Sequence, residues 1–444
     1  MVDVTRVLIA NRGEMARRLI KHFKGLDIET VVVFSESEAD YAHLDEADYA
    51  VYLNGKTVKD TYLNAQRVLS AAMDAGCDAI HPGYCFLAER VDFFQMAAGA
   101  NVAVIGCDYQ VLPLVVDRFG LREVARQIGI PLIPASAVPD GEDGLATGAQ
   151  MGVPLFVKAR SGGALASVAQ LDQLPEAVAQ VRLAAEVATG DGTVYLERAV
   201  DSVRQIGTIV VADRHGHYLH LGECDGSLQV GYRTWVEEFG VTTVSDEMHQ
   251  RLGAAALALA RHVGWAGVGT VRWALTPDGG WYLLGFSARL TTGFSLVEQV
   301  QGVDLVETQL TTLSGEELKW SQDDAHPTTH GLQLRVFHVD TSDLSRPEGI
   351  LERMVLPEGV MVEPGVDEGD YCTADTDPLL VKITVVAPTR HAAIVRARVA
   401  LNELVIEGIT HNIEVLKQLL DTDIFWDRKY DARTLADLVA AANG

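Results

Sequence analysis

The sequence predicts an α/β fold over its N-terminal part and α+β folds over the rest. Up to residue 106, short apolar runs alternate with helix-length amphipathic segments, and this alternation is typical of a parallel sheet covered by helices. Further along, longer strand-like runs are joined by the turn sequences DRHG (213–216) and PDGG (277–280). Such turns favour antiparallel hairpins, so the two parts of the chain are expected to differ in sheet type.

The N-terminal sheet is predicted from four short apolar runs. These are residues 4–10, 29–35, 78–83 and 100–106. After the first run, Met15, Leu19, Phe23 and Leu26 recur at helical spacing. This spacing predicts a helix that packs its apolar face on the sheet.

Two breaks divide the remainder of the chain. The Pro-rich stretch 130–144 is typical of a linker, and the polar stretch 321–330 is a second break. Between them, residues 247–264 predict a helix that separates two pairs of strands. After the second break, a strand over 381–389 and a helix over 390–405 predict a compact α+β unit.

Composition restricts the partners and the location. The chain has 444 residues, 48% of them hydrophobic, which is enough for two or three cores, and no apolar stretch is long enough to span a bilayer. A net charge of −25 disfavours nucleic acid and acidic membranes, so we expect protein partners and no membrane insertion. No basic region precedes the first apolar run, so no signal peptide is predicted. Five cysteines without a C-x-x-C pair indicate reduced thiols and a cytoplasmic protein.

Several motifs point to one family. VLIANRGEMARRLI, IHPGYCFLAER, PLFVKA, YLERAV, GVGTVRW, HGLQLRV and NELVIEGITHNIEVL resemble, in order and spacing, the biotin carboxylase component of biotin-dependent carboxylases. The resemblance implies a Rossmann-like N-terminal domain (1–115), an ATP-grasp domain (116–329) with a lid at about 133–203, and a biotin carboxylase C-terminal domain (330–444). Members of this family use ATP, Mg²⁺ and biotin on a carrier.

The phosphate-binding loop of the family is altered in this sequence. The resemblance implies a glycine-rich loop after Lys158, whose backbone approaches the ATP phosphates. Here the stretch reads ARSGGALASV, with glycine only at Gly162 and Gly163. Ala164, Leu165 and Ala166 place Cβ atoms where the backbone would approach the phosphate oxygens, and Leu165 adds an apolar group where phosphate would lie. We therefore predict an ordinary hairpin that no longer binds phosphate.

The metal ligands of the family are also replaced. Its chemistry needs two carboxylates that hold Mg²⁺ against the phosphates. The matching positions are Arg272 and Gly285, and Ser287 stands in place of an asparagine. The sequence therefore predicts no metal site. The alternative is a relocated site that uses Glu237, Glu238 and Glu298.

The bicarbonate and biotin end of the site is only partly retained. The resemblance implies that Gly293 replaces the glutamate base, and that Tyr232, Arg233 and Thr234 replace a His-Gln-Lys triplet. Two arginines remain. Arg289 matches the arginine that clamps bicarbonate and Arg335 the one that stabilises the biotin enolate, and salt bridging to local acids is the alternative for both.

The adenine end keeps more of the family's residues. Lys158 matches a lysine that contacts the α phosphate, and Glu197 matches the hinge that binds adenine. Arg118 follows Asp117 where the family has Asp-Lys, and Gln205 replaces a histidine. These residues predict a residual nucleotide cleft in which adenine nucleotides bind weakly, and no cofactor is assigned. A buried structural Lys-Glu pair is the alternative.

Because the glycine-rich phosphate loop, the metal ligands and the base are all replaced, we expect a catalytically degenerate homologue. It would serve as a structural or regulatory subunit of a biotin-dependent acyl-CoA carboxylase complex in fatty acid metabolism, in a homo- or hetero-oligomer with an active homologue or other carboxylase subunits. One alternative is an active biotin carboxylase with relocated metal ligands. Another is a sensor that binds a carboxylate ligand in the cleft that is the active site in the family. No Met-Lys-Met stretch, the typical site of biotin attachment, is present.

Overall fold

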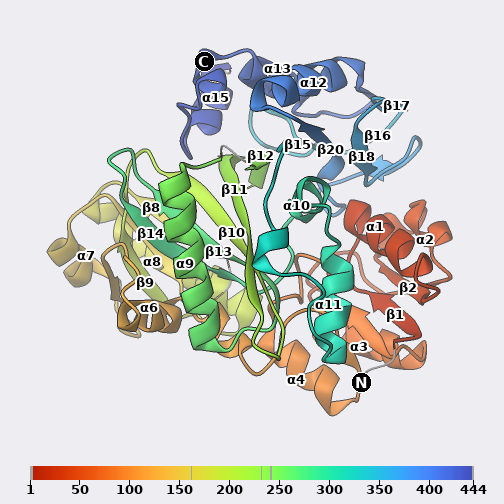
Figure 1. Cartoon of the computed structure of the whole chain (residues 1–444), viewed down its shortest axis with the longest axis horizontal. Coiled ribbons are helices and arrows are strands. Elements are labelled where there is room, and N and C mark those ends of the chain that lie inside the picture. The colour runs from red at the N-terminus through yellow and green to blue at the C-terminus, as the bar shows by residue number, and fades with distance from the viewer. Residues whose placement is uncertain (1–3, 162, 232, 241–242, 443–444) are drawn as a thin grey trace.

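The structure is a computed structural model of the whole chain and describes residues 4–161, 163–231, 233–240 and 243–442. In Figure 1 the N-terminal region lies at the lower right, the central region at the left and the C-terminal region at the top. The three regions correspond to the α/β and α+β parts that the sequence predicts.

The N-terminal region is built on a parallel five-stranded sheet in the order β3-β2-β1-β4-β5, as predicted. Its elements are β1 (Arg6–Ile9), α1 (Gly13–Lys24), β2 (Glu29–Phe34), η1 (Glu36–Glu38), α2 (His43–Glu46), β3 (Tyr49–Tyr52), α3 (Ala65–Asp74), β4 (Ala79–His81), α4 (Val91–Gly99) and β5 (Ala103–Val104). Met15, Leu19 and Phe23 are fully buried on α1. The prediction for Leu26 was wrong, because α1 ends at Lys24 and Leu26 is 43% exposed.

A small four-stranded sheet forms the region predicted as the lid. Its order is β6-β9-β7-β8, and all its pairs are antiparallel. The helices α5 (Leu112–Val116) and α6 (Arg118–Gln127) precede this region in the chain. The elements of the region are β6 (Ala135–Ala137), α7 (Leu145–Met151), β7 (Leu155–Ala159), β8 (Leu165–Val168), η2 (Leu171–Gln173), α8 (Leu174–Thr189) and β9 (Val194–Arg198). The stretch 130–144 is therefore not only a linker, because β6 pairs with β9 at the sheet edge.

The central sheet has eight antiparallel strands in the order β14-β13-β10-β11-β12-β15-β20-β18. The elements are β10 (Arg204–Ala212), β11 (Tyr218–Val230), β12 (Arg233–Gly240), α9 (Asp246–Val263), β13 (Gly267–Leu275), β14 (Trp281–Ser287), α10 (Phe294–Gln301), α11 (Leu305–Ser314), η3 (Gln322–Asp324), β15 (His330–Phe337), β18 (Met361–Pro364) and β20 (Leu379–Ala387). Both predicted hairpins are confirmed, β10 with β11 and β13 with β14. The sheet continues past residue 330, so the central and C-terminal regions share it.

The C-terminal region completes the sheet with helices and short strands. They are β16 (Gly349–Ile350), β17 (Arg353–Val355), β19 (Tyr371–Cys372), α12 (Arg390–Glu403), β21 (Val405–Glu407), α13 (Ile413–Leu420), α14 (Asp423–Trp426) and α15 (Thr434–Ala442). A buried ion pair joins this region to the N-terminal one. Lys382 Nζ on β20 lies 2.9 Å from Glu14 Oε2 on α1 and 3.3 Å from Glu363 Oε2 on β18.

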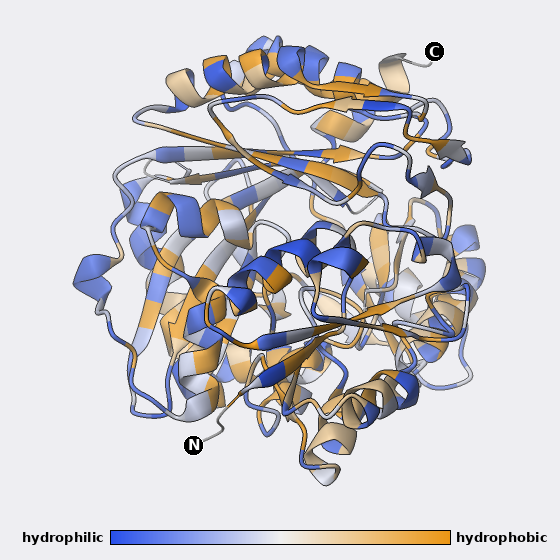
Figure 2. Cartoon of the chain, turned by 90° about the vertical axis from the view of Figure 1, so that its right-hand side faces the viewer, coloured by the Kyte–Doolittle hydropathy of each residue, from blue (hydrophilic) through white to orange (hydrophobic). Residues whose placement is uncertain are grey.

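The cores lie between the sheets and their helices. Figure 2 shows hydrophobic and hydrophilic residues on both the strands and the helices. All five cysteines are free thiols, as predicted. Among the described residues, no helix is both long and apolar enough to cross a membrane.

Candidate functional site: a cationic cleft

A cleft of about 1440 Å³ opens between the lid sheet, the N-terminal region and the central sheet. Of the residues singled out from the sequence, Arg118, Lys158, Glu197 and Arg289 line it. Arg272, Gly285, Ser287, Gln205 and Leu165 line it as well. Arg335 is 4% exposed and is not among the lining residues. The structure therefore brings the predicted adenine and metal positions into one cleft.

At the predicted adenine end, Lys158 and Glu197 contact each other on the neighbouring strands β7 and β9. Glu197 is 2% exposed, and its second oxygen accepts a hydrogen bond of 2.9 Å from Arg122 Nη1. Burial lowers the pKa of Lys158, and Arg118 and Arg272 lower it further. The carboxylate is thus held between two cations, and sequence reasoning missed Arg122.

The predicted phosphate loop is a tight hairpin. In the register of β7 and β8, Lys158 lies opposite Leu165, and Ala159 N donates to Ala164 O at 3.0 Å. Leu165 lines the cleft beside Lys158, as expected. Gly162 lies outside the described residues.

The start of this loop is tied to α6. Arg160 donates two hydrogen bonds to Asp117, from Nε to Oδ1 at 2.9 Å and from Nη2 to Oδ2 at 2.5 Å. Asp117 Oδ1 also accepts from the backbone N–H groups of Phe119 and Gly120 at the start of α6. A bidentate Arg-carboxylate pair is geometrically specific, so it fixes the loop at one end. This pair was not predicted, because its members are 43 residues apart in the sequence.

At the predicted metal position, Arg272 and Gly285 lie directly opposite each other on β13 and β14. A Cβ atom added at Gly285 would have Arg272 Nη2 as its nearest neighbour, at 3.7 Å. The guanidinium therefore occupies the space beside the missing side chain. A cation lies where the resemblance implies two carboxylates.

The positive charge of Arg272 is poorly compensated by its neighbours. Within the described part of the chain its guanidinium has no hydrogen bond or ion pair, and Nε is buried without a partner. Burial lowers the pKa of Arg272 to about 10, with Arg118 and Arg289 contributing by repulsion and Glu89 opposing them. The side chain of Arg118 likewise has no hydrogen bond or ion pair among the described residues. The cleft thus holds excess positive charge in a strongly acidic protein.

The three acids considered for a relocated metal site are all held in ion pairs outside the cleft lining. Glu237 contacts Arg335, and Glu298 contacts Arg18. Glu238 accepts from Arg390 at 2.7 and 2.8 Å and lies 2.9 Å from His330 Nε2. Burial opposes ionisation of Glu238, but the bonds from Arg390 and His330 outweigh it and lower the pKa of its carboxyl. Burial raises the pKa of Glu298 to about 7, which the charge of Arg18 partly offsets.

The predicted base position is filled by another residue. Gly293 precedes α10, and a Cβ atom there would collide with the carboxylate of Glu237. Arg335, whose guanidinium contacts that carboxylate, also donates to Thr234 O at 3.2 Å and to Gln333 Oε1 at 3.0 Å. Arg233 is exposed, and Tyr232 lies outside the described residues. A carboxylate therefore remains next to Gly293, but an arginine holds it.

Arg289 has its own partner in the cleft. Its Nε donates to Glu89 Oε2 at 3.1 Å, and its Nη1 donates to Leu290 O at 3.0 Å. Glu89 also accepts from the backbone N–H of Ala288 at 2.8 Å. The motif FLAER, which contains Glu89, was recognised in the sequence, but the role of this acid was missed.

Comparisons with known proteins place the chain. Residues 3–112 match the model of the biotin carboxylase N-terminal domain, 117–321 that of the carbamoyl-phosphate synthase L chain ATP-binding domain, and 333–437 that of the biotin carboxylase C-terminal domain. A biotin carboxylase of Halalkalibacterium halodurans is 34% identical over 427 residues, 95% of this chain and 94% of the relative. The chain belongs to the biotin carboxylase family. The resemblance found in the sequence is thereby confirmed.

A further relative agrees in sequence, and solved structures of biotin carboxylases agree in fold. The small subunit of 2-oxoglutarate carboxylase from Hydrogenobacter thermophilus is 31% identical over 97% of this chain and 93% of its own. A crystal structure of a Campylobacter jejuni biotin carboxylase complex has a TM-score of 0.91 and 28% identity over 98% of this chain and 99% of that one. The biotin carboxylase domain dimer of the Hydrogenobacter enzyme, crystallised with MgADP, ADP and bicarbonate, has a TM-score of 0.92 and 30% identity over 98% and 97%.

Proposed function

We propose that the chain is a non-catalytic biotin-carboxylase-like subunit with a structural or regulatory role in a biotin-dependent acyl-CoA carboxylase complex of the cytoplasm. One observation carries the proposal. The guanidinium of Arg272 lies opposite Gly285, at the two positions where the family resemblance implies carboxylate ligands of Mg²⁺. A guanidinium carries a fixed positive charge and cannot ligate a metal cation.

The surroundings of Arg272 support the same reading. Mg²⁺ needs oxygen ligands, and the described residues contain one group of His, Cys, Asp or Glu side chains close enough to hold a metal, which lies outside the cleft lining. Without a metal ion, the β and γ phosphates are not bridged and their charge is not neutralised as phosphoryl transfer requires. Leu165 further fills the cleft with an apolar side chain beside Lys158.

The framework supports a role in assembly. The buried pair between Lys382 and Glu14 connects the C-terminal and N-terminal regions independently of the cleft. A related biotin carboxylase domain crystallised as a dimer. We infer that this chain forms a homo- or hetero-oligomer with an active homologue or with other carboxylase subunits. Co-purification from the native cell tests this inference, and monomeric behaviour at tens of micromolar with no recovered carboxylase subunit contradicts it.

A second candidate is an active biotin carboxylase, which the comparisons fit equally well. The carboxylate of Glu237 beside Gly293 favours it, because this group stands next to the position of the family's base. The carboxylate-sensor alternative has less support, since Arg335 contacts Glu237 and only Arg289 reaches the cleft.

Phosphate release from ATP in the presence of biotin and bicarbonate separates the two candidates. For the non-catalytic subunit we expect no biotin-dependent release above a protein-free blank. A turnover of about 1 s⁻¹ or more, within the ordinary range of enzymes, contradicts the proposal. If phosphate release is seen, Glu237→Gln identifies its source. The substitution removes the release if Glu237 is the base, and it leaves the release unchanged if a contaminating ATPase produces it.

A further inference from the structure

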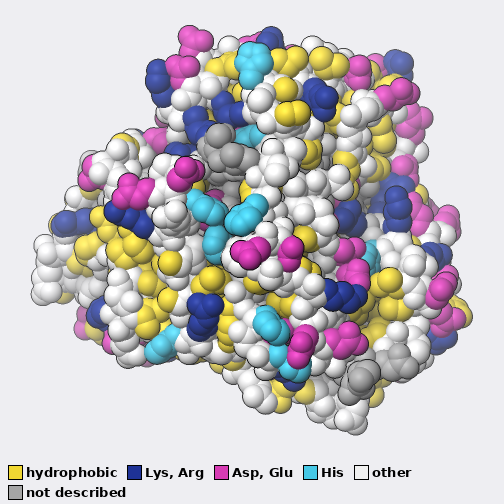
Figure 3. Space-filling view, in the orientation of Figure 1, with side chains coloured by type: hydrophobic (Ala, Val, Ile, Leu, Met, Phe, Trp, Pro, Cys, Tyr) yellow, Lys and Arg dark blue, Asp and Glu magenta, His cyan; other side chains and the backbone are white. Residues whose placement is uncertain are grey.

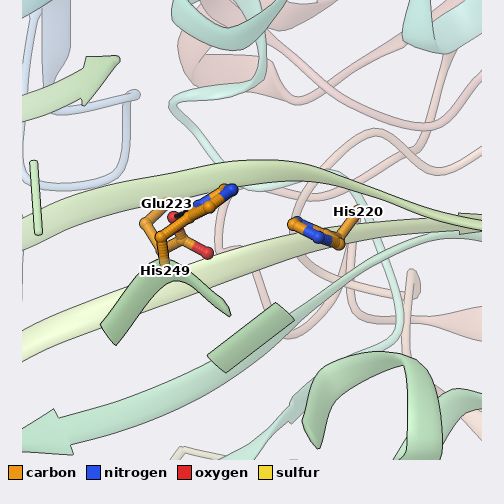
Figure 4. Close-up of side chains that lie close together, drawn as sticks. All are labelled: His220, Glu223 and His249. Carbon is orange, nitrogen blue, oxygen red and sulfur yellow. Dashed lines mark hydrogen bonds and ion pairs between the residues drawn. The ribbon is translucent and has the colours of Figure 1, made fainter. Parts of the chain in front are cut away.

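A second cluster of chemically active side chains lies away from the cleft, between the central sheet and α9. His220 and Glu223 come from β11, and His249 comes from the first turns of α9. One ligand-type atom from each residue lies within 4.8 Å of the other two. Figure 4 shows Glu223 and His249 side by side with the imidazole of His220 facing the same space. Figure 3 shows histidine side chains gathered on this face of the molecule.

A bulge in β11 brings two of these residues onto one face. In a regular strand, residues three apart point to opposite faces of the sheet. Opposite β10, however, Ile209 pairs with Gly222 and Val210 with His220, so Leu221 is an extra residue. Such bulges re-aim side chains. Leu221 therefore packs into the hydrophobic cluster on the other face, and His220 and Glu223 both face α9.

The position of His220 is fixed by its surroundings. The side-chain amide of Gln322 accepts from His220 N at 3.0 Å and donates to His220 O at 2.9 Å. On the helix side, a Cβ atom at Gly253 would lie 2.5 Å from His220 Nε2. Glycine in the middle of a helix is unfavourable, and here it gives the imidazole its room.

The cluster contains a buried carboxylate and a ring nitrogen that lacks a hydrogen-bond partner. His220 Nδ1 is buried without a hydrogen-bond partner among the described residues. Glu223 is 4% exposed, and His249 Nδ1 lies 2.6 Å from its Oε2. Thr208 donates a hydrogen bond of 3.4 Å to the other oxygen.

We propose that His220, Glu223 and His249 form a binding site for a divalent transition metal ion such as Zn²⁺. Two imidazoles and one carboxylate are a ligand set that binds transition metal ions in preference to Mg²⁺. Three protein ligands leave a fourth position for water. The bound ion ties the N-terminal turns of α9 to β11, and it is independent of the proposed function of the cleft.

Zn²⁺ itself is the probe for this site. Tag-free full-length protein is treated with chelator, desalted and titrated with ZnCl₂ by calorimetry. We expect one ion per chain with micromolar or tighter affinity and a rise in Tm of about 3 °C at a tenfold excess over Kd. Co²⁺ in place of Zn²⁺ is expected to give the intense visible absorption of a four-coordinate site.

Two variants test the proposed ligands, and a third is the control. His220→Ala and Glu223→Gln are each expected to weaken Zn²⁺ binding at least about tenfold and to abolish the Co²⁺ spectrum. His262→Ala, at the exposed end of the same helix, is the matched control and is expected to bind like the parent. Circular dichroism establishes that each variant is folded. No saturable uptake by the parent protein, or equal uptake by all three variants, overturns the proposal.

Discussion

Replacing Arg272 by methionine is expected to stabilise the protein. The charged guanidinium has no partner among the described residues, and Arg118 and Arg289 repel it. Methionine has a similar length, fills the same space and removes the charge. A substitution that deletes a polar side chain from a partly buried position usually destabilises, so the expected sign is opposite to the ordinary one.

The magnitude follows from the titration of Arg272. Its pKa is lowered to about 10, mainly by burial. Each pKa unit corresponds to about 1.4 kcal/mol, so the charged form costs the folded state on the order of 3 kcal/mol. Solvation of the guanidinium by water in the open cleft reduces this cost. We therefore expect a gain of about 1–3 kcal/mol, or about 2–6 °C in Tm for a region of this size.

Thermal unfolding followed by circular dichroism at neutral pH measures the change. Arg289→Met is the matched control, because Arg289 lines the same cleft but is paired with Glu89. We expect its Tm to stay equal or to fall. A lower Tm for Arg272→Met than for the parent would refute the reasoning, since it would mean that the guanidinium makes net favourable interactions.

The same variant tests the residual nucleotide cleft. An ATP molecule that binds with a Kd of about 0.1 mM stabilises the parent by about 1.4 kcal/mol at about 1 mM. Arg272 lines the cleft and its positive charge attracts phosphate, so ATP is expected to raise the Tm of Arg272→Met less. Mg²⁺ is expected to add nothing in either protein. A rise in the Tm of the parent that requires ATP and Mg²⁺ together contradicts the absence of metal ligands at positions 272 and 285.

Two further predictions concern the framework. Asp213 accepts hydrogen bonds from the backbone N–H groups of His215, His217 and Leu318; burial opposes its ionisation, but these bonds and the His217 side chain lower the pKa of its carboxyl to about 2. Because the pKa is lowered in the folded state, this stabilisation is present above about pH 4 and is lost as pH falls toward 2. Asp213→Asn is expected to lose on the order of 1–2 kcal/mol of unfolding free energy at pH 7, measured by urea unfolding, and this deficit is expected to shrink below pH 4. A deficit that does not change with pH contradicts the prediction. Lys382→Met leaves Glu14 and Glu363 buried without their cation. The variant is expected to lose about 3–5 kcal/mol of stability and to be cleaved faster by proteases between the N- and C-terminal regions. An unchanged Tm would show that both acids are protonated.

The fold was predictable where its signals are local. The parallel strands and both hairpins follow from apolar runs and turn residues. The strand β3 was not predicted, because it is a short edge strand that is mostly exposed. The strand β6 was hidden in a Pro-rich stretch, since an edge strand tolerates poor strand formers. Leu26 continues the helical spacing of α1 but follows its last turn.

The cleft was predictable only where the family resemblance supplied positions. It located Arg118, Lys158, Glu197 and Arg289, all of which line the cleft. The pairs that fix these positions were missed because their members are far apart in sequence. Arg160 and Asp117 are 43 residues apart, Arg122 and Glu197 are 75 apart, and Arg289 and Glu89 are 200 apart. The proposed metal site was missed for the same reason, and also because its bulge breaks the period-two pattern of β11.

Replacing Arg272, Gly285 and Gly293 together by glutamate is expected not to yield biotin-dependent phosphate release. Position 285 has room for a side chain, but a side chain at 293 collides with the carboxylate of Glu237, which must first move. Even with metal ligands in place, Leu165 still lies beside Lys158 where the phosphates would bind, and the loop offers them an apolar group in place of N–H groups. The defects therefore act in series, and repairing one set leaves the next. Adding Leu165→Gly to the triple variant is the matched comparison, and Mg²⁺-dependent ATP binding measured by calorimetry shows whether the metal ligands alone were restored. Phosphate release from the triple variant without the loop change would show that the loop was never limiting.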